Sequence, residues 1–176
     1  GKAVGLAQFL CVAHQFRVLA ANESGPWADW LRDLVEYACQ ETDRPGAGVI
    51  GLCLTGNFAL SLAIGPRVLA PVRGEPALPS TGGGLHVTPA ELAAVKARPE
   101  LEVRAYRYSA DLICRASLFA RLQAELGSQF KGTTLPSKNP LLHSVFTEDL
   151  RDGAGRLRHD KVQEVIASAI SAEMFA

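Results

Sequence analysis

Apolar residues along the chain form two kinds of pattern: short continuous runs, and stripes with helical spacing. Residues 47–52 (AGVIGL) and 68–72 (VLAPV) are continuous runs, which are typical of strands buried on both faces of a sheet. Residues 103–108 (VRAYRY) alternate as a strand does. Residues 8–13 (QFLCVA) and 130–135 (FKGTTL) are predicted to be the first and last strands.

Helices are predicted between these runs, where apolar residues recur at spacings of three and four. A helix start is clearest at Thr88, because Pro89 follows at the first helical position and Glu91 can complete a capping box. The predicted helices cover 27–40, 54–64, a segment after Thr88, 116–126 and a segment after Asp160.

Strands that alternate with helices in this way indicate an α/β fold with a mostly parallel sheet and helices on both faces. No interdomain linker or internal repeat interrupts the pattern, and residues 73–89 are interpreted as a loop within the domain. We therefore expect residues 1–176 to form one domain.

Composition narrows the classes of partner. The 18 basic and 18 acidic residues cancel and form no basic stripe, which argues against nucleic acid or an anionic membrane as the partner. The chain has no apolar stretch of membrane-spanning length. The four cysteines are widely spaced, without a CxxC pair, so we expect free thiols in the cytoplasm and no zinc site.

One of these cysteines stands where a strand passes directly into a helix. Cys53 follows the run 47–52, with Gly51 two residues before it and Gly56 three residues after it. Glycines at these positions permit the tight turn of a nucleophile elbow, and a helix N-terminus favours the thiolate. The backbone N–H of Leu54 is then expected to face a developing oxyanion. A buried structural cysteine is the alternative interpretation of this motif.

The elbow resembles that of the dienelactone hydrolase family in the α/β-hydrolase superfamily, which reads glycine-x-cysteine-x-glycine-glycine. Thr55 stands here in place of the first glycine of the pair. Residues 67–72 and 143–148 also look like one branch of this family, and the resemblance covers nearly the whole chain.

The resemblance implies a triad in the order nucleophile, acid, base. Asp111 follows the strand 103–108, and His143 follows the strand 130–135, as that order requires. Cys53, Asp111 and His143 are thus the candidate catalytic residues. The implied activity is hydrolysis of a small carboxylic ester or lactone, like that of a carboxymethylenebutenolidase, through an acyl-enzyme and without a cofactor. His86, in the Gly-rich stretch before Thr88, is a candidate for lining the substrate pocket.

The family's first strands have no counterpart in this chain, which is interpreted as an N-terminally truncated, C-terminal part of the fold. Those strands normally support a second oxyanion donor and a glutamate near the cysteine. An unpaired sheet edge, expected at 8–13, would favour a homodimer. Two other functions stay open: a catalytically silent hydrolase-fold fragment or interaction module, and a thioesterase or other acyl-transfer enzyme.

Overall fold

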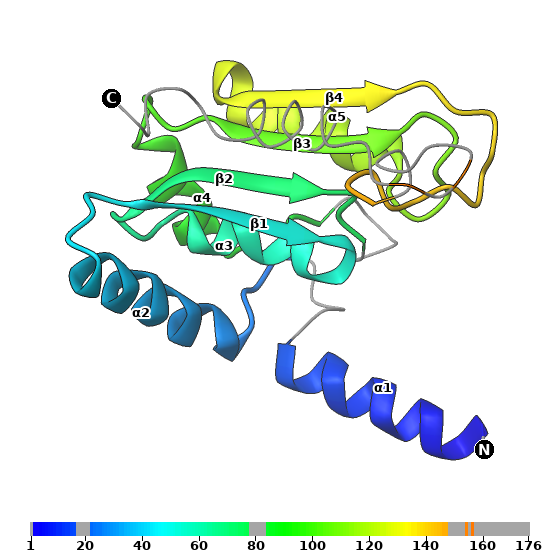
Figure 1. Cartoon of the computed structure of the whole chain (residues 1–176), viewed down its shortest axis with the longest axis horizontal. Coiled ribbons are helices and arrows are strands. Elements are labelled where there is room, and N and C mark those ends of the chain that lie inside the picture. The colour runs from blue at the N-terminus through cyan, green and yellow to red at the C-terminus, as the bar shows by residue number, and fades with distance from the viewer. Residues whose placement is uncertain (1, 17–21, 78–83, 148–153, 155, 157–176) are drawn as a thin grey trace.

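Four parallel strands, paired in sequence order, form the sheet at the centre of the fold (Figure 1). The computed structural model describes residues 2–16, 22–77, 84–147, 154 and 156. The strands are β1 (Ala47–Leu52), β2 (Val68–Gly74), β3 (Val103–Tyr108) and β4 (Phe130–Leu135). The α/β class with a parallel sheet is therefore confirmed, and these strands match the runs from which they were predicted.

The helices between the strands are also close to those expected. They are α2 (Pro26–Glu41), the 3₁₀ turn η1 (Cys53–Asn57), α3 (Phe58–Leu62), α4 (Pro89–Lys96), α5 (Ala116–Leu126) and the 3₁₀ turn η2 (Gly127–Gln129). The capping box at α4 is confirmed: Thr88 Oγ1 accepts from the Glu91 amide at 3.1 Å, and Glu91 Oε2 accepts from the Thr88 amide at 2.8 Å. The helix predicted after Asp160 lies outside the described residues.

The crossover helices α3, α4 and α5 share one buried cluster with β3 and β4. Successive right-handed crossovers that advance in one direction place their helices on the same face, which explains this arrangement. Helices on the opposite face, which the sequence predicted, are not seen among these crossovers. The cluster comprises Leu60, Ala63, Leu85, Val87, Val95, Leu101, Val103, Ala105, Cys114, Leu118, Phe119, Leu122, Leu126 and Phe130.

A second, smaller cluster covers the carboxyl ends of β2 and β3. It joins Val72, Tyr106 and Tyr108 to Val145, which is 2% exposed and lies beyond β4 in the sequence. Phe146 packs edge-on against Tyr106, with ring centroids 5.3 Å apart. Hydrophobic burial therefore holds the segment around residue 145 against the sheet.

The prediction of a strand at residues 8–13 is wrong. These residues belong to a helix, α1 (Lys2–Phe16), which contacts α2. A short apolar run fits a strand or a helix equally well, and the Ala, Leu and Gln residues around this one favour a helix. Four large apolar residues of α1 are exposed: Leu6, Phe9, Leu10 and Val12.

The free edge of the described sheet beside α2 is consequently β1, rather than residues 8–13 (Figure 1). Ile50 on this strand is 47% exposed. An open strand edge can pair with another chain, so self-association stays a prediction, now assigned to β1. No helix in the described ranges is both long and apolar enough to cross a membrane.

The turn from β1 into η1 requires glycine at two positions. A methyl group at Gly51 would collide with the carbonyl oxygen of Thr55, and one at Gly56 would lie 2.9 Å from the carbonyl oxygen of Gly74. Both obstacles are backbone atoms, which cannot rotate away as a side chain can. The glycines are therefore needed for close backbone approach.

We expect Gly51→Ala to lower the free energy of unfolding by about 1–3 kcal/mol, the usual cost of forcing extra volume into packed structure. Gly5→Ala is the matched control, because a methyl group there meets nothing within 4 Å in α1. Urea denaturation should show the control within about 1 kcal/mol of the parent chain. Equal stability of Gly51→Ala and the parent chain would contradict the close approach at the turn.

Candidate active site

Cys53 occupies a strained backbone position at the carboxyl end of β1. Its φ is +51°, in the left-handed region that residues other than glycine rarely adopt. Strain of this kind persists only where the surroundings enforce it, and it is common at functional sites. Here the backbone also approaches itself closely at Gly51 and Gly56, so a sharp turn is present at Cys53, and its role as a nucleophile elbow stays a prediction.

Thr55 fastens the same turn. Its Oγ1 accepts a hydrogen bond from the Leu52 amide at 3.0 Å and donates one to the Leu52 carbonyl at 2.8 Å. The residue that departs from the family's glycine pair therefore supplies two hydrogen bonds across the elbow. Leu54, the candidate oxyanion donor, follows Cys53 in the first turn of η1, where helical amide groups have no partner within the helix.

Asp111 lies in the turn after β3, with its side chain fully buried. One carboxylate oxygen, Oδ1, accepts hydrogen bonds from the amides of Ile113 at 2.8 Å and Cys114 at 3.0 Å. The other oxygen, Oδ2, lies 2.7 Å from Nδ1 of His143. The buried carboxylate is thus hydrogen-bonded at both oxygens, as a buried charge must be.

The imidazole of His143 is oriented by this contact. A carboxylate can only accept, so Nδ1 of the imidazole donates to Asp111, and in the neutral ring Nε2 is the acceptor. The loop from β4 to His143 is fastened to the turn after β3, where Ser109 Oγ donates to the Ser137 carbonyl and accepts from the Ser137 amide, both at 2.9 Å. The structure therefore brings Asp111 and His143 together.

The contact between Cys53 and His143 is not made in this structure. Nε2 of His143 is buried and has no hydrogen-bond partner within the described part of the chain, which includes Cys53. The turn at Cys53 and the Asp111–His143 pair nevertheless lie at the same end of the sheet, where the carboxyl ends of the parallel strands meet. Hydrogen bonds of this type are often long in ligand-free enzymes and shorten when substrate binds.

Glu75, at the end of β2, is a further buried carboxyl group near this pair that the sequence interpretation missed. It is 1% exposed, and its Oε2 accepts from the Val145 amide at 3.1 Å. Burial raises the pKa of Glu75 to about 7, and the charge of His143 opposes the rise while that of Asp111 adds to it. The sequence does contain a signal for this residue, namely a carboxyl group directly after an apolar strand. Glu75 lies three residues beyond the segment 67–72 that carries the resemblance.

His86 is buried, at 3% exposed, in the segment that leads to α4. Its carbonyl accepts from Ser61 Oγ at 2.9 Å, and its φ is +56°. These observations fix its backbone against α3, and its role in substrate binding stays a prediction.

All four cysteines are free thiols, but their surroundings differ. Cys39 and Cys114 are buried, and burial is the main cause that raises the pKa of Cys114 to about 12. Cys11 is exposed on α1, and Cys53 is half-buried. No group of three metal-ligating side chains is found among the described residues.

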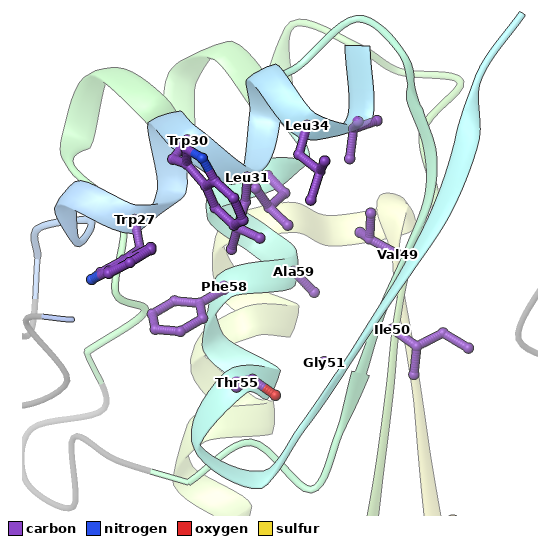
Figure 2. Close-up of a pocket in the computed structure, with 12 residues that line it drawn as sticks. Trp27, Trp30, Leu31, Leu34, Val49, Ile50, Gly51, Thr55, Phe58 and Ala59 are labelled. Carbon is purple, nitrogen blue, oxygen red and sulfur yellow. The ribbon is translucent and has the colours of Figure 1, made fainter. Parts of the chain in front are cut away.

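A cavity of about 530 Å³ lies between α2, β1 and α3, beside the elbow (Figure 2). Its walls are almost entirely apolar, with Trp27, Trp30 and Phe58 as the largest side chains. Gly51 and Thr55 of the elbow line it, whereas Cys53, Asp111 and His143 do not. This cavity is therefore not lined by the candidate catalytic residues, although it adjoins the turn that carries Cys53.

Comparisons with known proteins identify no relative of this chain. No family model, no curated protein and no solved structure matches the chain. The fold is thus established as a parallel α/β sheet, and the resemblance to the dienelactone hydrolase family stays a prediction from the sequence motifs.

Proposed function

We propose that this chain is a hydrolase of small carboxylic esters or lactones, of the dienelactone hydrolase type, acting through Cys53, His143 and Asp111. The observation that carries the proposal is the 2.7 Å contact between Asp111 and His143, at the sheet edge where Cys53 adopts its strained turn. A buried acid, an imidazole fixed by it and a thiol on a sharp turn are the parts of a nucleophilic triad. The free thiols also fit the reducing cytoplasm, which we propose as the location.

The chemistry needs only these side chains and water. His143 Nε2 takes the proton of Cys53, and the sulfur attacks the ester carbonyl to form a tetrahedral oxyanion, which the Leu54 amide stabilises. The C–O bond to the leaving alkoxide then breaks, and His143 returns the proton to that oxygen. Water, deprotonated by His143, next attacks the thioester and releases the acid and the free thiol. Asp111 stabilises the imidazolium in each step.

A catalytically silent scaffold is the second candidate, favoured by a specific observation. His143 Nε2 makes no hydrogen bond to the Cys53 thiol, although both residues are described. A protein that kept the fold and lost the chemistry would show this separation permanently, whereas an enzyme closes it with substrate bound. Measured activity separates the two.

Cys53→Ala should reduce hydrolysis of an activated aryl ester and of an enol-lactone to the uncatalysed rate, because the acyl group then has no acceptor. Cys11→Ala is the control: it removes an exposed thiol from α1 and should leave the rate unchanged. Initial rates of the purified chain and both variants give the answer. Hydrolysis that survives in Cys53→Ala would assign the chemistry to another group, and a parent chain without activity would favour the silent scaffold.

Asp111→Asn should lower kcat steeply, by as much as about ten-thousand-fold, the loss seen when an amide imposes the wrong imidazole tautomer in a serine triad. The amide oxygen can still accept from the Ile113 and Cys114 amides, so the chain should stay folded. Asp33→Asn, on an exposed position of α2, is the matched control. A variant that keeps more than a tenth of the parent kcat would remove Asp111 from the triad, and loss of the fold would make it a structural residue.

A further inference from the structure

The segment that follows β2 is tied to both neighbouring strands. The Glu75 amide donates to the Tyr106 carbonyl of β3 at 2.8 Å, and the Ala77 amide donates to the Cys53 carbonyl at 3.0 Å. Glu75 itself has a φ of +34°, a second strained position near the elbow. Its carboxyl group is therefore held at a fixed place between the elbow and the turn that carries Asp111.

From this place Glu75 binds the segment that carries His143. Its Oε2 accepts from the Val145 amide at 3.1 Å, and its carboxyl group is also hydrogen-bonded to the Ser144 side chain. Both partners directly follow His143 in the chain. The buried Val145 side chain supplies apolar packing, but apolar contact does not fix direction as a hydrogen bond to a carboxylate does.

The charges around Glu75 belong to the same site. His143 faces it from the segment after β4, and Asp111 faces it from the turn after β3. Cys114, next to the start of α5, also interacts with it. A carboxyl group with a pKa of about 7 changes its charge near neutral pH, which makes its hydrogen bonds to residues 144 and 145 stronger above that pH.

We propose that Glu75 is a positioning residue for the triad, which holds the backbone after His143 so that the imidazole stays against Asp111. This inference rests on the proposed function for its catalytic consequence, but the holding of the imidazole can be measured without activity. His143 is thus fixed twice: through its ring by Asp111, and through the following residues by Glu75. Residues that orient the ligands of metal sites commonly contribute tenfold to a hundredfold to activity, and we expect an effect of the same size here.

The test compares Glu75→Leu, which removes the acceptor, with Glu75→Gln, which keeps an oxygen acceptor and removes the charge. Glu100→Gln, an exposed carboxylate paired with Arg98, is the control. The first readout is the proton resonance of the Nδ1–H group shared with Asp111, recorded by NMR. The second is kcat and KM for an activated aryl ester, with thermal unfolding as the check on the fold.

We expect the resonance to be sharp in the parent chain, in Glu75→Gln and in the control, and broadened by exchange in Glu75→Leu. We also expect kcat to fall by about tenfold to a hundredfold in Glu75→Leu with KM little changed, and to recover in Glu75→Gln. If Glu75 contributed to folding alone, Glu75→Leu would lower the unfolding temperature but would not lower kcat selectively over KM.

A folded Glu75→Leu variant with a sharp resonance and the parent kcat would overturn the proposal. If Glu75→Leu does not fold, Glu75→Asp replaces it, because the shorter side chain cannot reach the Val145 amide, and the same two results are expected. If the parent chain hydrolyses no ester, the proposed function fails, and the resonance alone decides: broadening supports the positioning role and its absence refutes it.

Discussion

The site depends on one buried carboxylate. One oxygen of Asp111 is hydrogen-bonded to the backbone of its own turn, and the other is hydrogen-bonded to His143, which follows β4 in the sequence. The turn fixes the carboxylate, and the carboxylate fixes the imidazole, so the segment after β4 acquires a defined place on the sheet. Burying the Asp111 carboxylate without its hydrogen bonds to the backbone amides and to His143 would cost too much free energy. Both sets of hydrogen bonds are therefore needed to keep the carboxylate buried. Glu75 and the apolar cluster around Val145 act on the same segment from β2 and β3.

The parallel topology determines which residues can meet. Strands in sequence order present their carboxyl ends along one edge, so the residues that follow each strand become neighbours although long crossovers separate them. Cys53 follows β1, Glu75 follows β2, Asp111 follows β3 and His143 follows β4. Positive φ values at Cys53 and Glu75 show that two of the four strand ends turn sharply at this edge. The unfavourable backbone there is compensated elsewhere, in the buried cluster between the sheet and its crossover helices.

The sequence pattern was sufficient to predict an element where an apolar run directly follows a Gly–Pro turn, where apolar residues have helical spacing, or where a capping motif marks the start of a helix. The runs that became β1 and β2, the stripe of α5 and the capping box at Thr88 belong to this group. It was insufficient for residues 8–13, which form part of α1, because no Gly or Pro directly bounds this apolar run and such a run fits a helix as well as a strand. The order of Cys53, Asp111 and His143 predicted their shared edge, but the Asp111–His143 distance depends on loop conformations that spacing does not encode. Glu75 was missed because its importance arises from burial and from the Val145 amide, both of which are tertiary.

The central claim is that Cys53 differs in kind from the other thiols, and its alkylation rate tests that claim most directly. Cys11 serves as an exposed reference in the same molecule, while Cys39 and Cys114 are buried. With limiting iodoacetamide at neutral pH and mass spectrometry of the peptides, Cys53 should react at least about tenfold faster than Cys11 in spite of its lower exposure, because in the proposed triad His143 takes the proton of the Cys53 thiol. A Cys53 that reacts no faster than Cys11 would contradict an activated nucleophile and leave the site with a fixed imidazole that has nothing to deprotonate.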